Sequence, residues 1–272
     1  LRDREAGHAF ERGTVARIYS MTKPITSAAI MMLVERGLFH LDAPISDFRP
    51  AFAHPVELIP GATAIGQPVP GDVPTVHQLL THTAGMSYPF NPGILAQEMA
   101  EKDILFRSDD VSLADMVDRA AALPLAFEPG SRWEYSVSID ILGRIVEIVS
   151  GQTLGTFFQS EIFAPLGMTQ TGFSVRTDQR ANFAALYTPL EDSAFALGKT
   201  SLNGETLRLV DAPDASPFLN ATLQSGGGGL VGTIDDYMRF CEAIRLGGAL
   251  DCVRILSTVF RVSRAMILAR VP

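Results

Sequence analysis

Ser20 and Lys23 stand three residues apart at the point where an apolar helix is expected to begin. Residues i and i+3 share one helix face, so the Lys23 amine would lie beside the Ser20 hydroxyl. The partial positive charge at a helix N-terminus also favours an alkoxide or oxyanion there. The pair therefore predicts a serine nucleophile activated by a lysine rather than by a histidine.

Tyr135 is a second candidate for chemistry. It ends an extended segment that follows Pro129-Gly130 and immediately precedes a helix expected to start near Ser138. Catalytic groups are often displayed where a strand ends and a helix starts. A nearby ammonium favours the phenolate form of a tyrosine, which can then act as a base. By itself, Tyr135 also fits a packed side chain with one satisfied hydroxyl.

The elements that would position these residues are mostly helical. Apolar residues at helical spacing predict a helix over residues 24–36 with one stripe facing the core, stopped by Gly37. Further helices are expected over 76–80, 113–122 and 139–149 and after Thr233, and strand signals occur at 132–135 and 207–210. The Pro- and Gly-rich residues 55–74 predict an irregular surface loop. The pattern is α+β and rich in helix.

Composition fits an enzyme-sized globular chain. The 272 residues are 47% hydrophobic, enough for one large domain or two intimate ones. A net charge of −8 without a basic cluster argues against a nucleic acid partner. The longest apolar run, residues 25–34, is too short for a membrane span. No leader precedes it, but the chain opens on Leu1, so the compartment stays open with the cytoplasm favoured.

The chain offers no obvious metal or cofactor site. Cys241 and Cys252 are expected to be free thiols, and neither C-x-x-C nor H-E-x-x-H occurs. The glycine run at 226–229 lacks the G-K-[ST] ending of a phosphate-binding loop. We therefore expect no metal and no cofactor, and a tight backbone turn at the glycines.

Four motifs in order resemble the serine β-lactamase and penicillin-recognising superfamily. They are Ser20-x-x-Lys23, His82-Thr83-Ala84-Gly85, Tyr135-Ser136-Val137 and the run from Ser225 to Leu230. The resemblance covers about residues 5–256 and is greatest to family VIII carboxylesterases, which are similar to class C β-lactamases. It implies a β-lactamase-like α+β fold, an antiparallel sheet flanked by helices plus a helical subdomain. We expect a single domain over 1–272, with the helical subdomain at roughly 40–220 and sheet-associated parts at 1–39 and 221–272.

The resemblance also implies roles for individual residues. Ser20 would be the acylated nucleophile, and its backbone N–H would be one oxyanion donor. Lys23 would accept and donate the proton, and Tyr135 would be the base that activates Ser20 and later the deacylating water. His82 and Gly85 would form a structural turn near the cleft. Gly228 and Gly229 would lie beside the cleft.

Val137 bears on the choice of substrate. It stands where β-lactamases typically carry an asparagine that binds the amide of the antibiotic side chain. A valine cannot make that hydrogen bond, and a buried amide without a partner costs about 1–3 kcal/mol. The sequence therefore favours short-chain acyl esters as small-molecule substrates over the alternatives, a class C-like β-lactamase or a D-amino acid peptidase.

The chain also departs from the superfamily pattern at both ends. No K-T-G, H-x-G or W-G-G motif follows Gly229, and Lys199-Thr200-Ser201 comes too early to replace it. After Leu250 the expected strands give way to apolar residues interspersed with Arg261, Arg264 and Arg270, and little sequence precedes Ser20. We therefore expect a sheet incomplete at both ends. A catalytically inert protein of this fold is the remaining alternative, and the oligomeric state is open.

Overall fold

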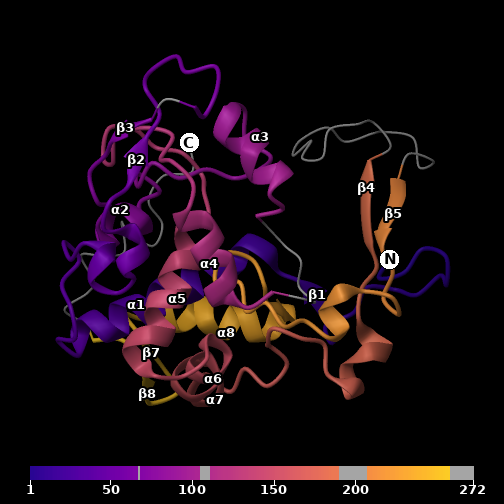
Figure 1. Cartoon of the computed structure of the whole chain (residues 1–272). Helices are drawn as coiled ribbons and strands as arrows, with labels where there is room; N and C mark the ends of the chain where they lie inside the picture. Colours follow the sequence, from indigo (N-terminus) through magenta and orange to yellow (C-terminus); the bar gives the residue numbers. More distant parts are fainter. Residues whose placement is uncertain (67, 105–110, 190–206, 258–272) are drawn as a thin grey trace.

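The computed structural model describes residues 1–66, 68–104, 111–189 and 207–257 (Figure 1). Lys199-Thr200-Ser201 and the three arginines after residue 257 lie outside the described residues. The helices of the described part are α1 (Thr22–Glu35), α2 (Val76–Leu80), α3 (Ile94–Glu101), α4 (Leu113–Ala121), α5 (Ser138–Ser150), α6 (Leu154–Phe158), α7 (Ala164–Leu166) and α8 (Ile234–Arg245). Its strands are β1 (Ala16–Arg17), β2 (Val56–Glu57), β3 (Val69–Pro70), β4 (Leu186–Pro189), β5 (Leu207–Asp211), β6 (Val231–Gly232), β7 (Ala249–Leu250) and β8 (Val253–Arg254).

Helix α1 packs against α5, which also contacts α2, α4 and α6, and these five helices form the helical body. The prediction of a single buried stripe is wrong, because nearly every residue from Thr22 to Leu33 is buried. Helix α5 packs along α1. The glycine turn that precedes β6 contacts the N-terminal half of α1 through Lys23 and Thr26. Gly37 ends the helix as expected, with a φ of 71° and its N–H donating to Val34 O at 2.9 Å.

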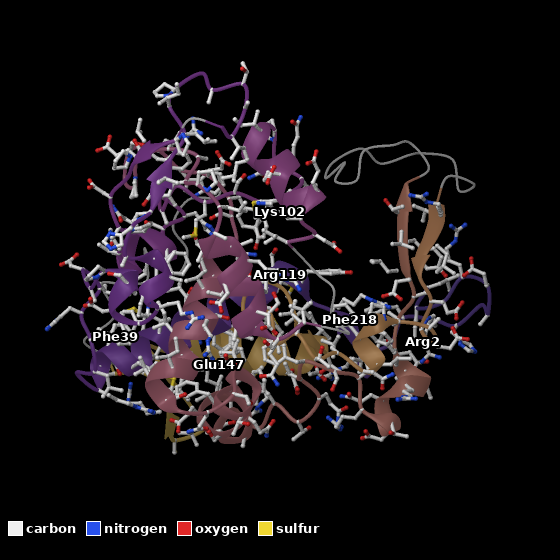
Figure 2. The ribbon with its side chains drawn as sticks, viewed as in Figure 1. Arg2, Phe39, Lys102, Arg119, Glu147 and Phe218 are labelled. Atoms are coloured by element: carbon white, nitrogen blue, oxygen red, sulfur yellow. The ribbon has the colours of Figure 1, made fainter. Side chains whose placement is uncertain are left out.

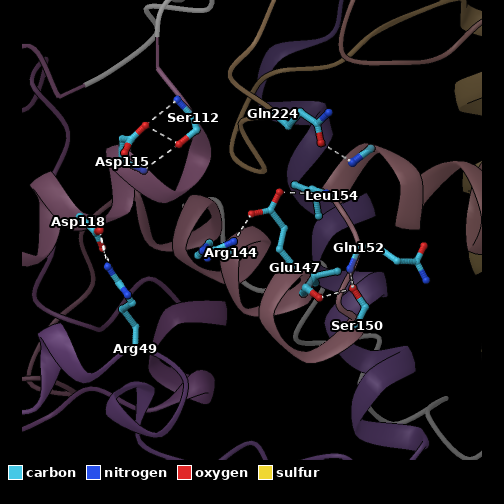
Figure 3. Close-up of polar contacts among 12 residues, drawn as sticks. Arg49, Ser112, Asp115, Asp118, Arg144, Glu147, Ser150, Gln152, Leu154 and Gln224 are labelled. Carbon is cyan, nitrogen blue, oxygen red and sulfur yellow. Dashed lines mark hydrogen bonds and ion pairs between the residues drawn. The ribbon is translucent and has the colours of Figure 1, made fainter.

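The helices predicted over 76–80, 113–122 and 139–149 and after Thr233 are confirmed as α2, α4, α5 and α8. Thr75 and Ser112 each form a capping box at the starts of α2 and α4, and Thr233 caps α8. Gly151 closes α5 in the left-handed conformation, with a φ of 68°. Figure 3 shows the Ser112 cap together with the Arg49–Asp118 ion pair, which ties α4 to the 3₁₀ turn Pro50–Phe52.

The described strands pair in twos rather than in one broad sheet. Strand β1 pairs antiparallel with β6, which brings the residues just before Ser20 beside the chain just after Gly229. The predicted strand at 207–210 is confirmed as β5, which pairs with β4 at one side of the helical body (Figure 1). The expected loop at 55–74 is irregular apart from the short β2–β3 pair. The α+β class is confirmed.

The strand predicted at 132–135 is wrong. Arg132 lies in a bend and residues 133–136 belong to no helix or strand, and the neighbour of this segment is the turn that follows α2. The N–H of Glu134 donates to His82 O at 2.9 Å, a single contact where a ladder would need several. Tertiary contacts therefore hold this segment in place of sheet hydrogen bonds.

The core has two parts. The larger one fills the helical body, where α1, α5 and the rings of Phe157, Phe158 and Phe163 pack together. The smaller one lies under β1 and β6 and consists of Val15, Val175, Phe183, Phe218 and Val231. Figure 2 shows Phe218 and Arg2 on the side of the β4–β5 pair, whereas Phe39 and Glu147 lie on the helical body.

Candidate active site

Ser20 lies in the 3₁₀ turn Tyr19–Met21, which runs directly into α1. Its side chain is exposed to solvent. Tyr19 has a φ of 40°, an uncommon value for a non-glycine residue, so the turn that presents the serine is sharply bent. Among the described residues, the backbone N–H of Ser20 has no hydrogen-bond acceptor. It is therefore free to face an incoming carbonyl oxygen.

Lys23 approaches Ser20 from the buried side. Its side chain is in the first turn of α1, and the residue is 9% exposed. The Lys23 Nζ donates to Ser20 Oγ at 3.2 Å and to Gly227 O at 2.6 Å, and it lies 4.5 Å from the centroid of the Tyr135 ring. The spacing of three residues thus brings the amine to the hydroxyl, as the helix argument predicts.

Tyr135 completes a three-residue cluster. Its Oη lies 2.5 Å from Ser20 Oγ, across 115 residues of sequence. The Asn91 Nδ2 donates to Tyr135 O at 2.8 Å, which fixes the backbone of the segment before α5. The serine hydroxyl therefore contacts both a phenol and an amine, the arrangement that general-base activation of a nucleophile requires.

His82 and Gly85 form the turn that supports Tyr135. A Cβ on Gly85, whose φ is 77°, would lie 2.4 Å from Phe127 O. The ring of His82 packs 5.0 Å from that of Tyr135, and its Nδ1 lies 3.2 Å from Ser136 Oγ. Burial, together with the charge of Lys23, lowers the pKa of His82 to about 3. The ring is therefore neutral near pH 7, which fits a packing role.

The glycine run forms the expected turn. The N–H groups of Gly228 and Gly229 both donate to Ser225 O, at 3.4 and 2.9 Å. Helix α1 holds this turn through its first residues: Thr26 Oγ1 donates to Gly226 O at 2.7 Å, and Thr22 Oγ1 accepts from Leu230 N at 3.2 Å. Because Lys23 also donates to this turn, its position and that of the nucleophile are linked.

Val137 lies directly behind Tyr135 at the start of α5. Its side chain is 1% exposed, and its backbone N–H donates to Ser87 O at 3.3 Å. The valine thus fills interior space beneath the site. Its influence on substrate choice stays a prediction.

The sequence reasoning missed two exposed aromatic side chains. Phe90 and Trp133 are 41% and 46% exposed, and the centroid of each ring lies 6.4 Å from that of Tyr135. They form an apolar border around the ring of Tyr135. Their signal in the sequence was weak, because single aromatic residues occur throughout the chain.

The sequence reasoning also missed a buried carboxylate. Asp140 is in the first turn of α5, is 1% exposed, and accepts hydrogen bonds from the glycine turn. An acidic residue inside an otherwise apolar helical pattern is a signal that could have revealed it.

We also searched the described residues for membrane-spanning helices and for groups of side chains that could bind a metal ion. None of their helices combines the length and apolarity that a membrane crossing requires. No group of three or more His, Cys, Asp or Glu side chains in that part of the chain could hold a metal ion, and both cysteines are free.

The chain belongs to the Beta-lactamase family, whose profile matches residues 1–258. The β-lactamase-like fold predicted from the four motifs is confirmed by the solved structures that resemble it. Esterase EstB of Burkholderia gladioli is 34% identical over 256 residues, which are 90% of this chain and 60% of EstB. This similarity confirms the resemblance to family VIII carboxylesterases.

Other relatives extend the comparison. Lovastatin esterase of Penicillium rubens is 36% identical over 177 residues, 63% of this chain and 43% of that enzyme. The solved structure of EstCE1, described as a hydrolase with promiscuous acyltransferase activity, matches with a TM-score of 0.68 at 28% identity. That match covers 93% of this chain and 64% of EstCE1. The chain spans about 60% of the length of EstB.

Proposed function

We propose that this protein is a serine carboxylesterase that cleaves short-chain acyl esters through an acyl-enzyme on Ser20. The observation that carries the proposal is the double contact of Ser20 Oγ with Tyr135 Oη at 2.5 Å and with Lys23 Nζ at 3.2 Å. The relatives named esterases support the same reaction class.

The geometry suggests a sequence of proton transfers. Tyr135 takes the proton of Ser20 as Oγ attacks the ester carbonyl, and the Ser20 N–H faces the developing oxyanion. The Lys23 ammonium, which stabilises the Tyr135 phenolate before this step, gives a proton to the leaving alkoxide and regains one from the Tyr135 phenol, which restores the phenolate. A water molecule, activated by Tyr135, then attacks the acyl group, releases the acid and restores the serine.

Acylation can be tested directly. Mixed with p-nitrophenyl butyrate, the protein should release a stoichiometric burst of nitrophenol and gain one butyryl group on Ser20 by mass spectrometry. The Ser20→Ala variant should show neither, and Ser27→Ala, a buried serine on the same helix, should retain both. Folded protein that forms no adduct would favour the alternative of a catalytically inert protein of this fold.

Hydrolysis of β-lactams or D-amino acid peptides is the competing activity. The preference for esters rests on Val137, which offers no hydrogen bond to a substrate amide. A chromogenic cephalosporin should therefore turn over at least about tenfold more slowly than the ester, the factor that 1.4 kcal/mol produces. Equal turnover would reverse this ranking.

Acyl transfer to an alcohol is a second candidate, favoured by the description of EstCE1. The same acyl-enzyme would serve, with an alcohol in place of water. Adding a primary alcohol should then divert part of the acyl group into a new ester. Unchanged yields of free acid across alcohol concentrations would exclude this reaction.

A further inference from the structure

Asp140 is a buried carboxylate for which the proposed reaction has no direct use. It is 1% exposed, and its Oδ1 accepts hydrogen bonds from Ser225 Oγ at 2.5 Å and from Gly227 N at 3.0 Å. Burying a carboxylate is costly unless hydrogen bonds and an opposite charge compensate it. We therefore expect a positively charged group near Asp140 that compensates the cost of burying its carboxylate.

Gly227 connects Asp140 to Lys23. Its N–H donates to the aspartate, while its carbonyl accepts from the Lys23 amine at 2.6 Å. The two charged side chains therefore hold opposite ends of one residue. A Cβ on Gly227 would lie 2.3 Å from Asp140 Oδ2, so only glycine allows this approach.

The electrostatic surroundings single out Asp140. Within the described part of the chain, the titratable side chains near Lys23 other than Tyr135 and Asp140 are His82, whose pKa is lowered to about 3, and Tyr88, whose pKa is raised by burial. Both are neutral near pH 7. Burial raises the pKa of Asp140, but the Ser225 hydroxyl, the charge of Lys23 and the Gly227 N–H all act in the opposite direction. The aspartate and the lysine thus stabilise each other's charge.

We propose that Asp140 is a positioning residue for Lys23. Its carboxylate fixes the Gly227 backbone to which the amine donates, and its negative charge holds the ammonium beside Ser20. The inference rests on the proposed role of Ser20 and Lys23. It adds α5 to the elements that build the site, because the carboxylate reaches the lysine through the glycine turn.

The test follows the NMR signal of Lys23 directly and does not require the protein to be an active enzyme. The chain has only three lysines, Lys23, Lys102 and Lys199, so protein carrying ¹³C at lysine Cε gives three signals that a Lys23→Arg variant assigns. Asp140→Asn keeps an oxygen acceptor for Ser225 and Gly227 but removes the charge. We expect the Lys23 signal to titrate about one pH unit lower in this variant, the shift that a tenfold change in proton affinity produces.

The matched control is Asp236→Asn. Asp236 is also a buried carboxylate, 5% exposed, and it accepts from Gln170 N and Thr171 Oγ1 near the start of α8. Its replacement should leave the Lys23 titration unchanged. An unshifted Lys23 signal in folded Asp140→Asn, or an equal shift in Asp236→Asn, would overturn the proposal.

A second variant covers the case in which Asp140→Asn does not fold. Ser225→Ala keeps the carboxylate but removes one hydrogen bond to it, so the Lys23 midpoint should move in the same direction by a smaller amount. No movement there would also overturn the proposal. If the wild-type protein forms no acyl adduct, the proposed function fails, yet the lysine titration still decides whether Asp140 holds Lys23.

Discussion

At the scale of single residues, the site depends on contacts between side chains distant in sequence. Ser20 is exposed, whereas Lys23 is buried behind it and Tyr135 reaches it from the segment before α5. In the proposed reaction, the exposed Ser20 is open to the substrate, the buried amine of Lys23 is shielded from solvent, and Tyr135 accepts the proton of Ser20 through its hydroxyl. The chemistry therefore depends on the Tyr135 hydroxyl more than on its ring.

Tyr135→Phe tests that dependence. The variant keeps the ring contacts with His82 and Trp133 and loses only the hydroxyl that touches Ser20. We expect acylation by p-nitrophenyl butyrate to slow by about 10²- to 10⁴-fold with little change in the thermal midpoint. Near wild-type acylation would assign the base role to another group. Tyr187→Phe, a surface tyrosine of β4, is the control.

His82 makes stability depend on pH. Its pKa is about 3 in the folded protein against an ordinary 6.5, so the unfolded chain binds a proton that the folded chain does not between these values. The free energy of unfolding should thus decrease as the pH falls from 6.5 toward 3. In His82→Asn, whose side chain tolerates the φ of 55°, urea melts at pH 7 and pH 5 should differ less. The exposed His54→Asn should retain the wild-type difference.

At the scale of elements, the turn after α2 decides where Tyr135 lies. Its backbone is bonded to the segment before α5 through His82 O and Thr83 O, which accept from Glu134 N and Gly130 N. The polar contacts in Figure 3 have a similar effect beyond α5, where Glu147 accepts from Leu154 N and Gln224 accepts from Gly155 N. These contacts fix the start of the glycine turn as well.

Gly85→Ala tests the turn. The new Cβ would meet Phe127 O at 2.4 Å in a backbone conformation that alanine disfavours. We expect the free energy of unfolding to fall by about 1–3 kcal/mol and acylation to slow, because the support of Tyr135 shifts. Gly13→Ala is the matched control, since nothing lies within 4 Å of its Cβ position. Equal stability of the two variants would contradict the assigned role of Gly85.

At the scale of the whole molecule, Arg17 joins the β4–β5 side to the start of α1. Its guanidinium pairs with Asp211 at 2.6 Å, donates to Ala184 O at 2.6 Å and lies 4.2 Å from the centroid of the Phe183 ring. The side chains of the ion pair are 2% and 13% exposed. Burial lowers the pKa of Arg17, and the charge of Asp211 opposes this effect.

A double-mutant cycle measures this connection. Arg17→Met leaves Asp211 without its partner, and Asp211→Asn leaves the buried arginine uncompensated. Each should lower the free energy of unfolding by about 3 kcal/mol, whereas the double variant should lose less than the sum. Urea melts provide the values. Additive losses would mean that the Arg17–Asp211 pair does not connect the β4–β5 side to the start of α1. The control is Arg12→Met, which removes an exposed ion pair with Asp235 and should have little effect on the free energy of unfolding.

The sequence by itself determined much of the local structure and three members of the site. Helix ends at Thr75, Ser112 and Gly151 follow from side chains that satisfy nearby backbone groups, so local chemistry is enough to predict them. The contact of Ser20 with Lys23 likewise follows from one helical turn. The division into a helical subdomain at 40–220 and sheet-associated ends stays a prediction.

Only the tertiary structure decided what surrounds these local features. The near-complete burial of α1, the loss of the strand expected at 132–135 and the approach of Asp140 to Gly227 all depend on segments that meet across many residues. Periodicity describes one face of one element, whereas burial and charge pairing depend on what packs against the other faces. For that reason the sequence indicated the proposed nucleophile, Ser20, and only the fold revealed the buried carboxylate of Asp140 behind the glycine turn.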